Sequence, residues 1–317
     1  MGQRMTSYLP WYLSYSLAAT VVAVLSGGAL LYHYQCEIIY PANFPEGSRT
    51  HVSKPSQYNL PYEDLTLITP DKVKIRAYLI KHPDDERART RPTIFYLHAN
   101  AGNMGHRLSI ADIFYREFKC NVFMLSYRGY GLSEGSPCEK GLRIDAQTAL
   151  NYIKEHPVVG ETKLIAYGQS IGGAVSIDIV ARNEDKFSGL IVENTFLSLP
   201  KVIPHVLPMI SRVAFLCHQI WNSEQMIQQI ARLPVLFLSG RKDELVPPAH
   251  MKELHRLLDT TGESVWREFP DGTHNDTCLK PGYFEAIKSF LDGIMGRRRS
   301  ESSQASRNPQ TRDPQDL

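Results

Sequence analysis

The chain is poor in cysteine and carries little net charge. Its 317 residues include five cysteines with no metal-binding spacing, namely Cys36, Cys120, Cys138, Cys217 and Cys278. The odd number argues against a full disulfide framework and leaves one optional bridge open. A net charge of +2 gives no reason to expect nucleic acid or an acidic partner. The length suits one large α/β domain or two small ones.

Charged side chains are absent from one long stretch near the N-terminus. Residues 13–34 contain no Asp, Glu, Lys or Arg, and they are numerous enough to cross a bilayer as a helix. Aromatic residues cluster near the two ends of this stretch, as interfacial anchors do: Trp11, Tyr12, Tyr15, Tyr32 and Tyr34. We therefore expect residues 1–36 to form an uncleaved membrane anchor. The alternatives are a cleaved signal peptide, whose apolar region is usually shorter, and a buried core helix.

The orientation of this anchor depends on very few charges. Arg4 precedes the span, and Arg49 and Lys54 are the first basic residues after it. This bias weakly favours a single-pass type II protein of the endoplasmic reticulum or plasma membrane, with its main domain lumenal or external. Residues 1–6 also match the N-myristoylation pattern, although a spanning helix makes a lipid anchor redundant.

The remainder of the chain predicts an α/β domain over residues 62–296, after a Pro/Asn/Ser-rich linker at 37–61. Two strands, 65–70 and 74–81, precede a charged stretch at 83–91 that we expect to be a surface loop. Strands then alternate with helices: strands at 93–97, 121–125, 163–167, 189–193, 235–238 and 264–269, and helices at 107–118, 139–155, 173–181, 248–258 and 283–295. This order predicts a mostly parallel, doubly wound sheet with an antiparallel leading edge.

Two segments depart from this alternation. Residues 195–233 contain three prolines and many apolar side chains, so we expect a small cap of irregular structure over one edge of the sheet. Residues 297–317 begin with three arginines and continue in polar residues, which predicts a disordered, solvated tail. The arginines could instead contact anionic lipid or act as a retention signal.

A Gly-x-Ser-x-Gly motif lies at residues 168–172. An apolar strand precedes it and a helix follows it, so Ser170 is expected on a sharp strand-to-helix turn with its hydroxyl exposed. Such a turn strains the serine and leaves no space for side chains beside it, which explains the glycines. The alternative is a tight turn with an incidental serine.

An acid and a histidine follow this serine in the order that such sheets use. Asp243 comes after strand 235–238, and His274 comes after strand 264–269. All three side chains are therefore expected at the carboxyl edge of the sheet, where ligands bind. Each could be an ordinary loop residue, and Glu244 and Asp271 are weaker candidates for the acid. Together they predict a nucleophilic serine activated by a histidine base.

A tetrahedral oxyanion needs two backbone N–H donors. The expected donors are the amides of Ile171, directly after the serine, and Asn100, in the loop at residues 98–103. His98 and Arg128 are expected to brace neighbouring loops. No metal or organic cofactor is implied.

Several motifs resemble the α/β-hydrolase superfamily: HANAGN, SYRGYGLSEGSP, YGQSIGG, NTFLSL, SGRKDELVPP and GTHND. They are most similar to the membrane-anchored bud-emergence-type hydrolases of fungi and their animal α/β-hydrolase-domain relatives, from about residue 62 to residue 295. The resemblance implies that Ser170 is the nucleophile, Asp243 the acid and His274 the base. Ala99 and Ser126 depart from the glycine and aspartate common there. Similarity to protein depalmitoylases implies a lipid ester or thioester substrate.

The favoured hypothesis is a membrane-anchored serine hydrolase acting on a lipid or acyl-protein ester or thioester. The alternatives are a catalytically silent scaffold in signalling or polarity, and a serine peptidase.

The one N-x-Ser/Thr sequon, at Asn275, directly follows His274.

Overall fold

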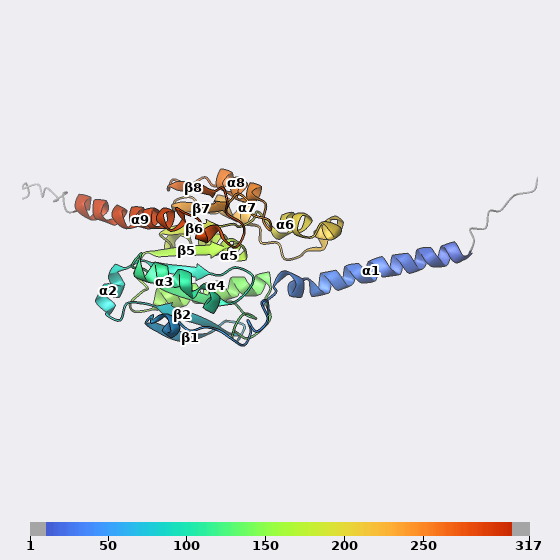
Figure 1. The fold of residues 1–317 in the computed structure, drawn as a ribbon, viewed down its shortest axis with the longest axis horizontal. Helices are drawn as coiled ribbons and strands as arrows, with labels where there is room; N and C mark the ends of the chain where they lie inside the picture. The colour runs from blue at the N-terminus through green and yellow to red at the C-terminus, as the bar shows by residue number, and fades with distance from the viewer. Residues whose placement is uncertain (1–10, 306–317) are drawn as a thin grey trace, which may run out of the picture.

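The computed structural model describes residues 11–305, with the side chains of residues 14–296. Arg4, the myristoylation pattern and the end of the predicted tail lie outside these residues. One sheet of eight strands forms the centre, in the order β1-β2-β4-β3-β5-β6-β7-β8 (Figure 1). The strands are β1 Tyr62–Ile68, β2 Lys74–Ile80, β3 Thr93–Leu97, β4 Asn121–Ser126, β5 Leu164–Gln169, β6 Gly189–Glu193, β7 Val235–Gly240 and β8 Ser264–Phe269.

Strand β2 is antiparallel to both of its neighbours, β1 and β4. The pairs from β4 to β8 in the sheet order are parallel. Every residue of β3 to β7 is buried, as expected of parallel strands covered on both faces. The predicted fold class, a mostly parallel sheet with an antiparallel leading edge, is therefore confirmed.

Helices cover the two faces of the sheet and divide the core in two. Alternate residues of β3 show this, because Phe95 packs in one cluster and Tyr96 in the other. The first cluster includes side chains of α4 (Glu139–Glu155), α5 (Ile171–Arg182) and α8 (Pro248–Leu257). The second includes side chains of α3 (Leu108–Arg116) and α9 (Tyr283–Ala305).

The helices differ from the prediction at two places. The charged stretch expected to be a loop contains α2 (Asp85–Thr90), because the Asp84 carboxylate accepts from the amides of Glu86 and Arg87 and caps the helix. Helix α9 continues to Ala305, past the boundary set at residue 296. The Arg, Glu, Gln and Ala residues of that extension favour helix, although they cannot form a core.

The N-terminal helix α1 (Trp11–Ile39) projects from the sheet on the side away from the end of α9 (Figure 1). The most apolar 18-residue window within Ser14–Ile39 has a mean hydropathy of 1.7, and none of that window is buried. The core-helix alternative is therefore wrong. Among the described residues this is the one helix long and apolar enough to cross a membrane.

The stretch predicted as a linker is ordered against the domain. Tyr40, Ser48 and Leu60 are buried, and a short 3₁₀ helix, η1, spans Pro55–Tyr58. The side-chain amide of Asn103 donates to the carbonyl oxygens of Ser48 at 2.8 Å and of His51 at 3.0 Å. The connection between α1 and the sheet is thus part of the folded domain.

The segment expected to be an irregular cap consists of short helices. They are α6 (Leu199–Val206), the 3₁₀ helix η4 (Pro208–Leu216), α7 (Ser223–Met226) and η5 (Ile227–Gln229). In Figure 1, α6 projects from the sheet on the same side as α1. The end of η4 packs against α1, where Leu216 lies beside Gly28.

Candidate active site

Ser170 lies on the turn between β5 and α5, with φ 56° and ψ −121°. This left-handed conformation is strained for a residue with a side chain. The glycine at 172 is needed because a Cβ there would lie 2.0 Å from the carbonyl oxygen of Leu97. A Cβ at Gly168 would lie 2.1 Å from the carbonyl oxygen of Gly172. The motif therefore holds the serine where the chain leaves the sheet.

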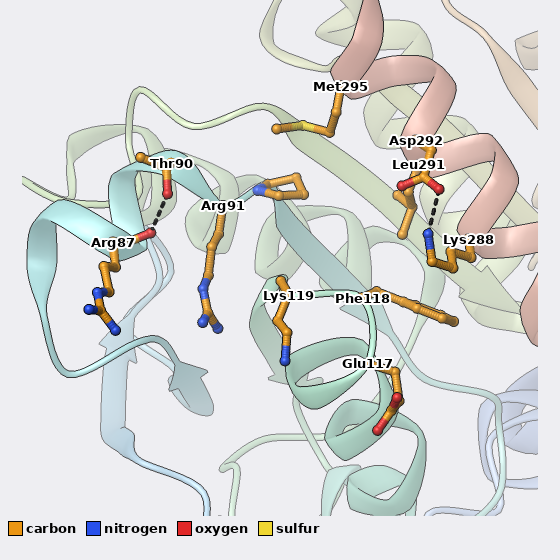
Figure 2. Close-up of a pocket in the computed structure, with 11 residues that line it drawn as sticks. Arg87, Thr90, Arg91, Glu117, Phe118, Lys119, Lys288, Leu291, Asp292 and Met295 are labelled. Carbon is orange, nitrogen blue, oxygen red and sulfur yellow. Dashed lines mark hydrogen bonds and ion pairs between the residues drawn. The ribbon is translucent and has the colours of Figure 1, made fainter.

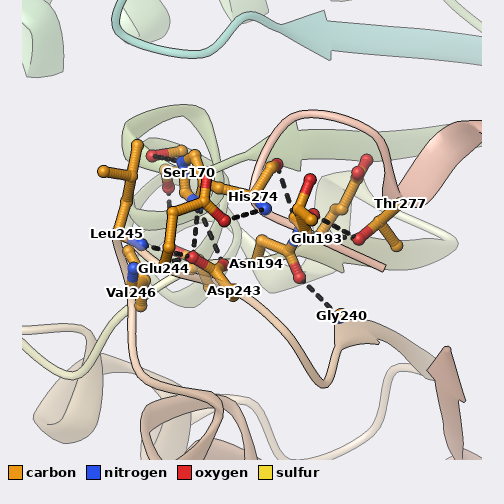
Figure 3. A network of polar contacts seen from close by, with 12 residues as sticks. Ser170, Glu193, Asn194, Gly240, Asp243, Glu244, Leu245, Val246, His274 and Thr277 are labelled. Carbon is orange, nitrogen blue, oxygen red and sulfur yellow. Dashed lines mark hydrogen bonds and ion pairs between the residues drawn. The ribbon is translucent and has the colours of Figure 1, made fainter. Parts of the chain in front are cut away.

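The structure brings together the serine, acid and histidine predicted from the sequence (Figure 3). His274 Nε2 lies 3.1 Å from Ser170 Oγ, and His274 Nδ1 lies 2.8 Å from Asp243 Oδ2. The carboxylate can only accept, so Nδ1 carries the hydrogen and Nε2 is left as the acceptor for the serine proton. All three side chains are almost buried, which strengthens their electrostatic interaction.

Asp243 is fixed in place by the backbone that follows it. Its Oδ1 accepts from the amides of Leu245 at 2.9 Å and Val246 at 2.7 Å. These bonds compensate for burying the carboxylate and aim its other oxygen at His274. The two weaker candidates have other partners than the His274 ring: Glu244 accepts from the backbone amide of His274 at 3.2 Å, and Asp271 pairs with Lys242 on the surface.

Asn194 holds the histidine loop, a role that our sequence analysis missed. Its side-chain amide donates to the carbonyl oxygens of Thr273 and His274, each at 3.2 Å. Its Oδ1 accepts from the amide of Gly240 at 2.8 Å, so one side chain joins the ends of β6, β7 and β8 (Figure 3). The sequence feature that could have identified Asn194 is its position directly after β6, at the same edge of the sheet as the site.

A second buried network lies behind the serine. The carboxylate of Glu193 accepts from the hydroxyls of Tyr167 at 2.7 Å and Tyr283 at 2.5 Å. Burial raises the pKa of Glu193, and the two hydroxyls oppose that shift. Its backbone carbonyl accepts from the Ser170 amide at 2.9 Å. Glu193 therefore holds the turn that carries Ser170, and it does not line the cavity.

The two residues predicted as oxyanion donors flank the serine. Ile171 begins α5, and Asn100 lies in the loop after β3; both line the cavity that contains Ser170 and His274. The Asn100 side chain is engaged elsewhere, because its Nδ2 donates to the carbonyl oxygen of Ile39 and its Oδ1 accepts from Tyr130 at 2.6 Å. Only the main chain of Asn100 is left to face a substrate.

His98 and Arg128 have the bracing positions expected of them. The buried His98 ring packs against Tyr127, and its Nδ1 lies 2.7 Å from the carbonyl oxygen of Ala99. Burial lowers the pKa of His98 to about 4, so the ring is neutral at physiological pH. Arg128 binds the buried carboxylate of Asp145 with Nε at 2.9 Å and Nη2 at 2.8 Å.

The cavity at Ser170 has a volume of about 310 Å³ and is lined mainly by apolar side chains. They include Phe44, Phe196, Leu199, Val202 and Val206. A larger cavity of about 440 Å³, shown in Figure 2, is lined by charged residues around α2 and α9. It lies near the amino ends of β3 and β4, away from Ser170, so size alone does not identify the site.

In the described part of the chain, no three His, Cys, Asp or Glu side chains are grouped so as to hold a metal ion. All five cysteines are free thiols in the structure.

The fold and the arrangement at Ser170 define an α/β-hydrolase, and comparisons with known proteins agree. The family model described as "Serine aminopeptidase, S33" matches residues 88–226. The chain is 50% identical to protein bem46 of Schizosaccharomyces pombe over 295 residues, which are 92% of this chain and 97% of that protein. It therefore belongs to the α/β-hydrolase family that includes bem46.

Two further proteins are similar. The "Uncharacterized membrane protein YNL320W" of Saccharomyces cerevisiae is 44% identical over 281 residues, covering 88% of this chain and 95% of that one. The crystal structure of a Pyrococcus furiosus esterase, Pf2001, superposes with a TM-score of 0.64 at 18% identity, covering 78% of this chain and 96% of that one. At this identity the second likeness shows the fold alone.

Proposed function

We propose that the protein is a membrane-anchored serine hydrolase that cleaves a carboxylic ester or thioester through an acyl-enzyme. The observation that carries this proposal is the chain of contacts from Ser170 Oγ through His274 to Asp243, at the mouth of an apolar cavity. A serine hydroxyl becomes a strong nucleophile only when a positioned base takes its proton, and His274 Nε2 is within reach.

Each group has a defined part in the proposed reaction. The Ser170 oxygen attacks the substrate carbonyl while its proton passes to His274 Nε2, and Asp243 stabilises the resulting imidazolium. The amides of Asn100 and Ile171 stabilise the negative oxygen of the tetrahedral intermediate. His274 then gives its proton to the departing alcohol or thiol, which leaves Ser170 acylated. A water molecule attacks this acyl-enzyme by the same route and releases the acid.

The proposed substrate has an apolar acyl group and belongs to a lipid or an acylated protein. The apolar walls of the cavity suit such a chain, because burying each CH₂ contributes about 0.8 kcal/mol. The cavity is also lined by Pro41 and Phe44, which follow the end of α1 within a few residues. A substrate held in the bilayer therefore meets the site close to the membrane surface.

Membrane anchoring through residues 13–34 is part of the same proposal. Its support is the length, apolarity and exposure of α1, together with a 44% identical yeast relative named a membrane protein. We propose a single-pass protein of the endoplasmic reticulum or plasma membrane, with the type II orientation weakly favoured by Arg4.

Probe labelling separates a silent scaffold from this function, and a comparison of substrates separates a peptidase. Full-length protein in membranes is treated with a fluorophosphonate probe, which reacts with activated serines, alongside Ser170→Ala and His274→Ala variants. A hydrolase labels and both variants do not, whereas a silent scaffold leaves the wild-type protein unlabelled. A peptidase, the activity that the matched family model is named for, would label too but would cleave aminoacyl amides faster than acyl esters.

A further inference from the structure

The tip of the cap exposes apolar side chains beside the predicted membrane span. Met209 is 98%, Phe215 is 79% and Leu207 is 41% exposed. Water-soluble surfaces rarely concentrate large apolar side chains in this way, so such a patch indicates a surface that is covered. The cap tip is defined here as residues 207–216.

The contact of the cap tip with α1 indicates how deep the cap tip lies in the membrane. The side chain of Leu216 packs beside Gly28, which lies inside the charge-free stretch 13–34. Gly28 is six residues before Tyr34, which places it about 9 Å deeper along the helix axis. That depth agrees with the ~5–10 Å to which interfacial elements bury their apolar faces.

The contact between the cap and α1 is specific. Gln35 Nε2 donates to the carbonyl oxygen of Leu216 at 3.3 Å, and Gln35 Oε1 accepts from the amide of His218 at 2.8 Å. Gln35 is almost buried, and the ring of Tyr32 packs edge-on against His218. One glutamine thus satisfies two backbone groups at the end of η4, which fixes the cap tip alongside α1.

The sequence of this region suits a lipid surface. Residues 195–220 contain Lys201 and Arg212 but no Asp or Glu, and Arg212 is exposed. Between α1 and the cap runs a groove walled by Leu31, Ile38, Ile203, Leu207, Ile210 and Val213. Apolar side chains with cations and without carboxylates are typical of elements that lie in an anionic membrane surface.

We infer that the cap tip inserts into the same leaflet as the end of α1 and that lipid acyl chains fill the groove between them. This inference rests on the membrane anchoring in the proposed function. Helix α6 then separates the leaflet from the cavity, since Ile203 and Leu207 line the groove while Val202 and Val206 line the space at Ser170. The cap would deliver acyl chains to the site from the membrane side.

Depth-dependent quenching tests the insertion in the full-length protein. Phe215→Trp is compared with Val22→Trp, in the middle of the span, and with Ile68→Trp, an exposed position on β1. All three are made in a Trp11→Phe background, whose own signal from Trp221 and Trp266 is subtracted, and are reconstituted in phosphatidylcholine–phosphatidylserine vesicles with brominated acyl chains. We expect Phe215→Trp to lose fluorescence mainly to bromines near the glycerol, Val22→Trp to deeper bromines, and Ile68→Trp to neither.

Each outcome decides between explanations. Quenching of Val22→Trp without quenching of Phe215→Trp overturns the inference and leaves the anchor intact; a second copy of the chain covering the cap tip would give this result. Absence of quenching at both positions removes the anchor as well as the insertion. Fluorophosphonate labelling of the same samples reports folding and the hydrolase separately, so failure of the proposed chemistry is visible on its own.

Discussion

The side-chain amide of Asn100 donates a hydrogen bond to the carbonyl oxygen of Ile39, the last residue of α1. The loop proposed to stabilise the oxyanion is therefore held by the chain that leaves the membrane helix. A second bond joins the amide of Gly102 to the carbonyl oxygen of Phe44 at 2.7 Å. The segment after α1 thus connects the anchor to the geometry of the site.

A pair of truncations tests this connection. Deletion of residues 1–36 removes most of α1 but keeps Ile39, Phe44 and Ser48, so we expect a soluble protein that fluorophosphonate still labels. Deletion of residues 1–53 also removes the carbonyl groups that hold Asn100, Gly102 and Asn103, and we expect labelling to be lost. The connection is refuted if both proteins label equally. The assignment of α1 as the single anchor is refuted if the shorter deletion still pellets with membranes in high salt and carbonate.

Asp243→Asn tests the choice of acid. An amide can donate to His274 Nδ1 and so favours the wrong tautomer, which lowers kcat by about 10⁴-fold in Ser-His-Asp hydrolases. We expect a loss of that order on a short-chain ester with an unchanged melting temperature. The matched control is Asp271→Asn, a surface carboxylate paired with Lys242, which should keep wild-type turnover. Equal losses in the two variants would contradict the assignment.

Asn194→Gly tests the support of the histidine loop. Glycine accepts the left-handed backbone at this position, φ 44°, so the variant removes the side chain without adding backbone strain. We expect a loss of about 1–3 kcal/mol in unfolding free energy, because buried carbonyl and amide groups lose their partner. We also expect kcat to fall more than KM rises. Asn151→Ala, an exposed change on α4, is the control, and a variant with wild-type kcat would rule out positioning.

His98 predicts a pH dependence of stability. Its folded pKa of about 4 lies below the ordinary value of 6.5, so the unfolded chain takes up a proton first as the pH falls. Above pH ~6.5 His98 is neutral in both states and does not change the free energy of unfolding. Between pH ~6.5 and pH ~4 its protonation in the unfolded chain lowers that free energy progressively, by about 3 kcal/mol in total. Nearby Arg107 and His106 act in the same direction.

Urea unfolding measured across this pH range checks the expectation. His98→Phe keeps a ring against Tyr127 but cannot be protonated, so it should be less stable at neutral pH and lose less stability on acidification. The same slope in wild-type and variant proteins would show that His98 does not control it.

Asn275 tests the side of the membrane on which the domain lies. Its side chain is exposed and lines the cavity at Ser170, so a glycan there would obstruct the site. We expect active protein to carry no sugar at Asn275. An endoglycosidase-sensitive mass shift, absent in Asn275→Gln, from a sample that still hydrolyses substrate would refute this. A second sequon placed near Ser302 reports the compartment, since its glycosylation would place the domain in the lumen.

Local patterns in the sequence determined the class of fold and the identity of the proposed catalytic groups. Buried parallel strands are continuous apolar runs, and amphipathic helices have their own period, so the alternation after residue 93 predicted the sheet. The pattern of the glycines around Ser170 was visible locally, although the steric limit at Gly172 comes from Leu97 on the neighbouring strand β3. Asp243 and His274 were predictable because parallel strands end at one edge and the chain order of the three residues is characteristic.

Tertiary structure alone decided what surrounds these groups. Asn194, Glu193 and Gln35 act through partners that are remote along the chain, and such contacts leave no local pattern in the sequence. Residues 40–61 look like a linker because they form only short local turns, and the contacts that order them against the domain come from the distant loop at Gly102 and Asn103. From the sequence, the cap tip is expected only to cover the site. Its position along α1 is known only from the contact with Gly28 in the structure. The local sequence determines which backbone conformation each segment adopts. The partners of a buried polar side chain are determined only when the fold brings remote segments together.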